Sequence, residues 1–387
     1  MDSDRQETLI LGIDIGSTTV KAVVVDVSSR EIVWSDYQRH KTRQADKTLE
    51  LLKAIETRFG ELHQRARAFV TGSGARPLAT PLGAGFVQEV NAVALAVETQ
   101  HPDAGSVVEL GGQDAKFIVF MVDPRSGQKL PVCSMNDKCA SGTGATIDKC
   151  LTKIGMTAEE ASAVRFDVTK LHKVAAKCGV FAETDIVNLV KSGIRAPKIL
   201  CSLADAIVQQ NLSVLARGNT LRHKVLLLGG PNTYLPVLQE CWRVRVPETW
   251  RERRYDYPSD VPIDQLILVP PNAQYYAAYG AAIYGLEEPQ HVGRYRGCAV
   301  LERHIADEDR AGRRTGGGPP LIHSTEELHE FKRTWDPPSF LPPQLIRGQT
   351  IRGVIGLDGG STSSKAVLLD EQGEPDRLAS DWTAVPC

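Results

Sequence analysis

One stretch of sixteen residues occurs twice in this chain and limits the folds that it can adopt. Leu11–Asp26 reads LGIDIGSTTVKAVVVD, and Ile355–Asp370 reads IGLDGGSTSSKAVLLD. The two copies agree at nine of sixteen positions, without a gap, 344 residues apart. In the first copy a Gly-Ser-Thr turn separates two apolar, β-branched runs, which is typical of a β-hairpin. We therefore expect Leu9–Ile15 and Val20–Val25 to be paired strands.

A second hairpin of the same kind is predicted further along the chain. Val107–Leu110 and Phe117–Val122 are apolar runs on either side of Gly111-Gly112. Two hairpins with glycine-containing turns within the first 125 residues indicate two similar lobes.

The remaining pattern alternates short apolar runs with segments of helical periodicity. Further strands are expected at Ile32–Trp34, Ala68–Thr71, Val225–Leu228 and Leu266–Val269. Helices are expected at Thr48–Phe59, Gln88–Thr99, Gly144–Ile154, Val180–Lys191, Leu200–Ala216 and Gln274–Tyr284. This alternation predicts an α/β protein.

The domain organisation follows from where this pattern stops. Residues 9–286 are expected to form one unit, with lobe I at about 9–100 plus 274–286 and lobe II at about 101–273. Residues 287–350 are rich in Arg, Pro and Gly and favour a linker or irregular extension. One short helix is predicted from Ser324, because Ser324-x-x-Glu327 is a capping-box pattern.

Bulk composition excludes several classes of protein. The net charge of −2 gives no basis for binding nucleic acid or anionic membranes. No apolar run approaches the roughly 20 residues that span a bilayer, and the polar N-terminus is not a signal peptide. We expect a cytoplasmic protein whose eight cysteines are thiols or metal ligands rather than disulfides.

The first hairpin carries the residues that a phosphate site needs. Asp14 ends a strand beside a Gly turn, and a carboxylate there can hold Mg²⁺ directly or through water. Backbone N–H groups and hydroxyls in the turn can bind phosphate oxygens, and Lys21 adds charge or faces solvent. The candidate phosphate-binding residues of this hairpin are Gly16, Ser17, Thr18, Thr19 and Lys21.

The second hairpin supplies an opposing turn. Gly111 and Gly112 are followed by Gln113, which could orient an attacking water, and by the carboxylate of Asp114. Asp14, Gln113 and Asp114 are the candidate catalytic residues. Alone, either turn could be an ordinary polar hairpin turn, but two that face each other could clamp the phosphates of a nucleotide.

This arrangement resembles the superfamily of actin, sugar kinases and heat-shock chaperone ATPases. The resemblance covers residues 9–286 and implies two ribonuclease-H-like lobes with a nucleotide cleft between them. GIDIGSTTVKAVVVD resembles the first phosphate hairpin and ELGGQDAK the second. VLLLGGPNTYLPVL resembles the adenosine-side element, which implies that Gly229, Gly230 and Asn232 contact the nucleoside.

Two cysteine motifs narrow the resemblance further. MNDKCASGTG and KCGVFAETDIVNLVKSG resemble the activators of 2-hydroxyacyl-CoA dehydratases and the ATPase subunits of benzoyl-CoA reductases. The resemblance implies that Cys139 and Cys178 of two chains hold one 4Fe–4S cluster in a homodimer. Two thiolates per chain become four at a two-fold axis, as a cubane requires. Directly after Cys139, the cofactor-binding candidates are Ser141, Gly142, Thr143 and Gly144.

Alternatives remain open at this point. Four thiolates also suit zinc, Cys133 could be a ligand, and Cys150 fits a helix core. The resemblance implies an ATP-hydrolysing electron donor that receives electrons from a ferredoxin or flavodoxin. It would pass them to an iron–sulfur dehydratase or reductase that acts on CoA thioesters. The alternatives are a small-molecule kinase of the same fold and a regulatory ATPase with a structural metal.

The repeated stretch near the C-terminus has its own interpretation. Asp358, Gly360, Ser361, Thr362 and Lys365 match Asp14, Gly16, Ser17, Thr18 and Lys21. We expect residues 351–387 to begin a second ATPase unit, as in the large fused activases that this arrangement resembles, so that the chain would be the N-terminal piece of a longer protein. The alternatives are a fortuitous hairpin, or one that packs on the first unit or on a neighbouring subunit.

Overall fold

The structure is a computed structural model, and the chain divides into two compact units, residues 1–313 and 314–387. The residues that it describes are 8–60, 62–63, 65–125, 127, 129–136, 142–175, 179–216, 219–310, 321–336, 348, 350, 352–360 and 364–370.

The first half of the larger unit contains the two predicted hairpins. Its elements are β1 (Leu9–Ile15), β2 (Thr19–Asp26), β3 (Ile32–Arg39), α1 (Gln44–Phe59), β4 (Ala66–Thr71), α2 (Arg76–Leu82), β5 (Gly85–Phe86), α3 (Glu89–Gln100), β6 (Ser106–Leu110), β7 (Ala115–Val122) and β8 (Lys129–Asn136).

The second half is mainly helical. It comprises α4 (Gly144–Ile154), α5 (Ala158–Ser162), a 3₁₀ turn (Val168–Lys170), α6 (Gly179–Lys191), α7 (Ala196–Leu215), β9 (Val225–Leu228), α8 (Gly230–Tyr234), α9 (Pro236–Glu252), α10 (Ile263–Leu266), β10 (Ile267–Leu268), a second 3₁₀ turn (Ala273–Tyr275), α11 (Tyr276–Glu287) and α12 (Cys298–Arg310).

Two five-stranded sheets share one topology. The first has the order β3-β2-β1-β4-β5, and the second has the order β8-β7-β6-β9-β10. In each sheet the three strands that are consecutive in sequence pair antiparallel, β1 to β3 in the first sheet and β6 to β8 in the second. The other two strands pair parallel: β4 with β1 and β5 with β4 in the first sheet, and β9 with β6 and β10 with β9 in the second. The prediction of two similar lobes is therefore confirmed.

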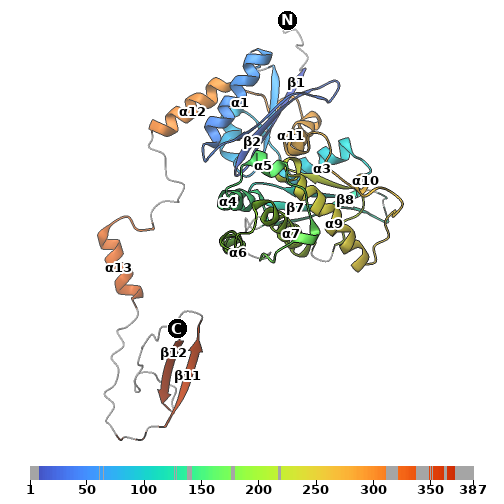
Figure 1. The fold of residues 1–387 in the computed structure, drawn as a ribbon. Coiled ribbons are helices and arrows are strands. Elements are labelled where there is room, and N and C mark those ends of the chain that lie inside the picture. The colour runs from blue at the N-terminus through green and yellow to red at the C-terminus, as the bar shows by residue number, and fades with distance from the viewer. Residues whose placement is uncertain are drawn as a thin grey trace. The chain divides into compact units, whose positions relative to one another are not determined.

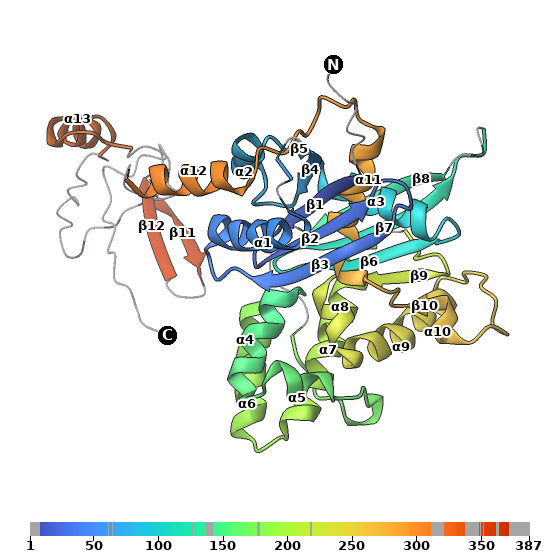
Figure 2. The same ribbon diagram turned by 90° about the horizontal axis from the view of Figure 1, so that it is seen from above.

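Strand alternation explains how the layers stack (Figures 1 and 2). Successive side chains of β1 and β2 point to opposite faces of the first sheet. One face packs on α1, α2 and α12, and the other packs on α3 and α11. The same two helices cover one face of the second sheet, whose other face carries the core of α4, α6, α7 and α9. Helices and sheets thus alternate in five layers.

The start of the segment with linker-like composition packs on the first sheet. Tyr295 and Leu301 are fully buried in the core beneath α1 and α2. The backbone N–H of Ala68 donates to Gly293 O at 2.7 Å, and the N–H of Tyr295 donates to Ala66 O at 3.1 Å. Residues 293–310 are therefore structurally part of the larger unit.

The smaller unit contains α13 (Thr325–Trp335) and the hairpin of β11 (Gly353–Gly359) with β12 (Ser364–Asp370). The predicted cap is present, because the hydroxyl of Ser324 accepts from the N–H of Glu327 at 3.2 Å. In the hairpin, Asp358 lies opposite Lys365, as Asp14 lies opposite Lys21 in the first copy. The β11 side chains are exposed, with Val354, Ile355 and Leu357 at 65%, 67% and 80%.

Candidate functional site

The two hairpin turns of the larger unit meet at one cavity of about 370 Å³. From the first hairpin the lining residues are Asp14, Gly16, Ser17, Thr18, Thr19 and Lys21. From the second they are Glu109, Gly111, Gly112, Gln113 and Asp114. Every residue proposed from the sequence for the two hairpins therefore lies on this cavity. The remaining wall comes from the segment that joins β4 to the start of α2, from the stretch between the end of β5 and the start of α3, and from Met135.

Glycine is required where the two turns touch. A Cβ atom on Gly112 would lie 2.1 Å from the Thr18 hydroxyl oxygen, which no packing tolerates. The absence of a side chain at Gly112 therefore lets the turns approach closely.

Asp14 and Lys21 form a buried ion pair in the cavity. The Lys21 ammonium donates to Asp14 Oδ2 at 2.7 Å. Burial alone would lower the pKa of Lys21, but the adjacent Asp14 carboxylate outweighs it and raises that pKa above its ordinary value. The other oxygen, Asp14 Oδ1, is buried with no hydrogen-bond partner in the described part of the chain. An oxygen of this kind fits Mg²⁺ or a water bound to it.

Lys116 forms a second charged centre, which was not predicted from the sequence. Its ammonium is fully buried and donates to Glu89 Oε1 at 2.9 Å and to Asp114 Oδ2 at 2.5 Å. It also lies 3.3 Å from Glu109 Oε2. Burial opposes the charge of Lys116, but these three carboxylates together raise its pKa well above the ordinary value.

A signal for this centre was present in the sequence. Glu109 lies opposite Lys116 across the second turn, as Asp14 lies opposite Lys21 across the first. In both hairpins the acid precedes the lysine by seven residues, so aligning the hairpins on this spacing identifies the pair. No spacing of this kind identifies Glu89, which lies at the start of α3, because only the tertiary structure brings it to Lys116.

The segment that follows Cys139 is attached to the second turn. The N–H of Gly144 donates to Gly111 O at 3.0 Å, and the N–H of Ala145 donates to Gly112 O at 2.7 Å. The Thr143 hydroxyl also donates to Gly112 O, at 3.1 Å. The start of α4 therefore rests directly on a turn of the cavity. Gly142, two residues before α4, is fixed by α7, because its carbonyl accepts a hydrogen bond from the Asn211 amide at 2.9 Å.

The adenosine-side element is close to the second turn, but one prediction within it is wrong. Gly229 has a φ of +87°, and a Cβ there would lie 2.1 Å from Leu110 O. Asn232, however, is fully buried, and its amide group donates to Val108 O and Leu228 O. Its carbonyl oxygen accepts from the Trp242 indole. The Asn232 side chain therefore holds β6, β9 and α9 together and does not face a nucleoside.

The second glycine of this element lies against the first sheet. A Cβ atom on Gly230 would lie 2.6 Å from the hydroxyl of Tyr37, a residue of β3. Tyr37 also meets Tyr234 of α8 edge to face, with ring centroids 5.7 Å apart.

The predicted cluster ligands precede α4 and α6 in the sequence. Cys139, Cys178 and Ser141 lie outside the described residues. Within the described part no group of three or more His, Cys, Asp or Glu residues could hold a metal ion. The helices after the two cysteines, α4 and α6, lie side by side (Figures 1 and 2), and Lys149 pairs with Glu183 at 3.6 Å. Cys150 is fully buried in the core, as predicted.

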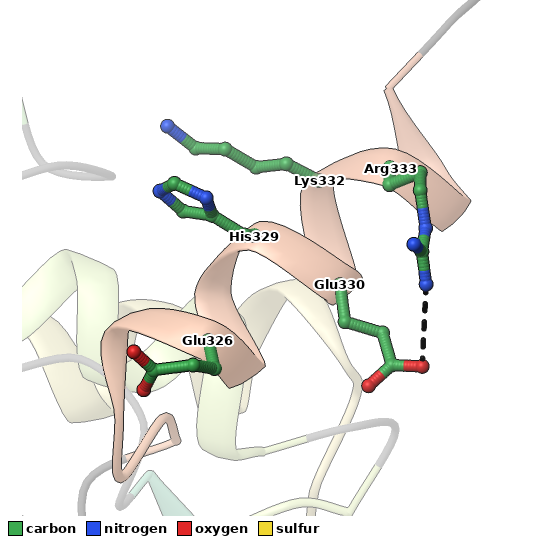
Figure 3. Close-up of a pocket in the computed structure, with 5 residues that line it drawn as sticks. All are labelled: Glu326, His329, Glu330, Lys332 and Arg333. Carbon is green, nitrogen blue, oxygen red and sulfur yellow. Dashed lines mark ion pairs between the residues drawn. The ribbon is translucent and has the colours of Figure 1, made fainter.

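A hollow in the smaller unit differs in character from this cavity. It is lined by five exposed side chains of α13 (Figure 3): Glu326, His329, Glu330, Lys332 and Arg333. Glu330 pairs with Arg333 at 3.6 Å, which is an ordinary pair on a helix surface. No convergent buried polar group lies among the five.

Comparison with known proteins identifies the family. The BadF/BadG/BcrA/BcrD ATPase family model matches residues 11–244. The chain belongs to this family of ATPases. It is 25% identical to the activator of lactoyl-CoA dehydratase of Anaerotignum propionicum over 280 residues, which are 72% of this chain and 98% of the relative. It is also 26% identical to the 2-hydroxyisocaproyl-CoA dehydratase activator of Clostridioides difficile, over 72% of this chain and 95% of the relative.

A solved structure supports the fold. The activator of the 2-hydroxyisocaproyl-CoA dehydratase from Clostridium difficile, with bound ADPNP, superposes with a TM-score of 0.57 at 22% identity. The match covers 77% of this chain and 97% of that one. The chain therefore has the fold of this activator, and the predicted α/β fold with two similar lobes is confirmed. No helix in the described part of this ATPase family member is long and apolar enough to cross a membrane.

Proposed function

We propose that this ATPase is an activator that uses ATP hydrolysis to deliver a low-potential electron to a partner iron–sulfur enzyme. The partner would act on CoA thioesters, as a 2-hydroxyacyl-CoA dehydratase or an aryl-CoA reductase does. The names of relatives support this assignment, because they include activators of lactoyl-CoA and 2-hydroxyisocaproyl-CoA dehydratases and one component of a benzoyl-CoA reductase.

One observation carries the proposal, namely the contact between α4 and the second turn. Gly144 and Ala145 donate to the carbonyls of Gly111 and Gly112, and the segment containing Cys139 leads directly into this contact. A movement of the turn on nucleotide binding or hydrolysis would therefore move the start of α4. A ligand can shift such an arrangement when it binds its two states with different affinity.

The nucleotide would bind with its phosphates between the two turns. The Ser17, Thr18 and Thr19 hydroxyls and the glycine backbone would bind phosphate oxygens, and Asp14 would hold Mg²⁺ through its free oxygen. Lys21 holds the Asp14 carboxylate in place through its hydrogen bond. Gln113 would orient the attacking water.

Cys139 and Cys178 are the proposed cluster ligands, two from each chain of a homodimer. When bound, a 4Fe–4S cluster supplies a one-electron redox centre whose potential depends on its surroundings. Val180 and Phe181 follow Cys178 and are exposed apolar residues in the first turn of α6. A second copy of the chain at this position would cover them. A ferredoxin or flavodoxin would supply the electron.

Iron analysis of anaerobically purified protein tests the proposal. We expect about one 4Fe–4S cluster for two chains, together with Mg²⁺-dependent ATP hydrolysis. Cys139→Ala and Cys178→Ala should each remove the iron, and Cys133→Ala is the matched control that should retain it. A full complement of iron in either ligand variant would refute the assignment of the ligands.

A second candidate function, a small-molecule kinase, is favoured by the shape of the cavity. The cavity extends past the turns to Arg76, Phe86 and Gln88, where a phosphoryl acceptor could bind. This function predicts ATP consumption that depends on an added acceptor and protein that contains no iron. The same iron analysis therefore separates the two candidates.

We also propose that residues 351–387 open a second unit of the same kind. The Asp358–Lys365 pair, at 3.3 Å, has the register of the pair in β1 and β2. In β1 and β2 the apolar faces are covered by helices, whereas the equivalent residues of β11 are exposed.

A further inference from the structure

Glu89 lies on the cavity and bonds to Lys116, although the two residues belong to different elements. Glu89 is the first residue of α3, and its Oε1 accepts from the Lys116 ammonium at 2.9 Å. This bond fixes the carboxylate beside the second hairpin. The other oxygen, Oε2, has no hydrogen bond to any residue that the structure describes, and the side chain is 23% exposed. Water can therefore reach the Glu89 side chain.

The other three carboxylates of the cavity are less suited to take up a proton. Asp14 accepts from Lys21 with one oxygen and presents the other to the proposed Mg²⁺. The Glu109 side chain is only 5% exposed. Asp114 is turned back on its own hairpin, with Oδ2 on Lys116 and Oδ1 2.0 Å from the position of a Gly111 Cβ. Glu89 is therefore the one of these four carboxylates whose free oxygen is neither reserved for the proposed Mg²⁺, nor almost fully buried, nor turned back on its own hairpin.

We propose that Glu89 accepts the proton of the water that attacks the γ-phosphate, an inference that rests on the proposed ATPase function of this site. The water oxygen bonds to the γ-phosphorus, and the bond from that phosphorus to the β–γ bridging oxygen breaks. ADP leaves with the electron pair of that bond. The water proton passes to Glu89 Oε2, and from there to solvent.

The electrostatic surroundings of Glu89 agree with this role. Burial, together with the charges of Asp14, Glu109 and Asp114, raises the pKa of Glu89 to about 7 against the opposing effect of the Lys116 charge. A general base is most efficient when its pKa lies near the working pH. Lys116 remains held by Glu109 and Asp114, so protonation of Glu89 does not leave a buried charge without a partner.

Steady-state ATP hydrolysis by the full chain tests the inference. Glu89→Gln keeps an oxygen that can accept from Lys116 but cannot take up a proton at neutral pH. We expect kcat to fall about 100-fold or more, with the Kd for ADP changed less than about 3-fold. Glu98→Gln, on the exposed side of the same helix, is the control and should hydrolyse ATP at the wild-type rate.

Chemical rescue provides an independent measurement. In Glu89→Ala, sodium formate should restore part of kcat with a saturable concentration dependence, and it should not accelerate the wild type or Glu98→Ala. The inference would be overturned if the kcat of Glu89→Gln stayed within about 3-fold of the wild-type value. It would also be overturned if the substitution weakened nucleotide binding and left kcat unchanged. A wild-type protein without ATPase activity would instead refute the proposed function.

Discussion

At the scale of single residues, acid–lysine pairs organise the site. Asp14 faces Lys21, Glu109 faces Lys116 and Asp358 faces Lys365, each pair in the same position across a hairpin turn. In the first two pairs the lysine offsets a buried carboxylate that would otherwise repel a phosphate. Such pairs can therefore sit beside a polyanionic ligand at a modest electrostatic cost.

Substitution of Asn232 tests whether this residue has a structural role or contacts the nucleoside. Because its amide satisfies two strand carbonyls and the Trp242 indole, Asn232→Ala should lower the free energy of unfolding by about 2–3 kcal/mol. The KM for ATP should stay within about 2-fold of the wild-type value. Urea unfolding and ATPase kinetics measure the two effects, with the exposed Asn188→Ala as control. A large rise in KM with unchanged stability would restore the nucleoside role.

The candidate site could be predicted in part from sequence. The turn residues were found because glycine, hydroxyl and carboxylate groups cluster in a recognisable local order. Glu89 and the structural role of Asn232 were not found, because each depends on a neighbour more than 25 residues away in sequence, at Lys116 and Val108. A local pattern carries no information about such partners.

At the scale of elements, the contact between the two hairpin turns controls the cavity. Gly112→Ala would place a methyl group 2.1 Å from the Thr18 hydroxyl oxygen, so the Thr18 side chain or the turn that carries it must shift. We expect ATP turnover to fall about 100-fold, since misplacement by an ångström has this effect on positioned groups. The melting temperature should change little, because the contact involves surface turns and not the core. ATPase rate and melting temperature are the measurements.

Replacing the partner residue provides the control for this prediction. Thr18→Gly combined with Gly112→Ala removes the clashing side chain and should recover part of the lost turnover. If Gly112→Ala alone hydrolyses ATP at the wild-type rate, the two turns do not act as one clamp.

Most elements could be predicted from hydrophobic periodicity, and the exceptions have physical causes. β1, α4 and β9 begin and end at the residues expected. β8 was missed because it is an exposed edge strand without the alternation that burial imposes. α9 was missed because Pro236 and Pro247 mark breaks in a sequence pattern, although Pro236 is the first helical residue, where proline is tolerated. α12 lies in a segment of linker-like composition.

At the scale of the whole molecule, the boundary between the two units can be tested by truncation. A protein that ends at Arg313 keeps α12 and should retain the ATPase rate and iron content of the full chain. A protein that ends at Glu288 loses Tyr295 and Leu301, which are fully buried under α1 and α2. Each such side chain stabilises by about 1.5–3 kcal/mol, so the shorter protein should be clearly less stable.

Comparison of the two truncations decides the role of the C-terminal repeat. Loss of ATPase activity or iron on removal of residues 314–387 would make the second hairpin copy an integral part of the first unit. The proposal of one ATPase unit followed by the start of another would then be wrong.

The central claim is that the nucleotide state of the cavity is coupled to an iron–sulfur cluster held by Cys139 and Cys178. The most direct measurement is the electron paramagnetic resonance spectrum of the dithionite-reduced protein, with and without Mg–ATP. We predict a reduced-cluster signal, at about one cluster for two chains, that changes on ATP addition in the wild type but not in Asp14→Asn. Protein without iron, or spectra that are identical with and without ATP, would contradict the claim.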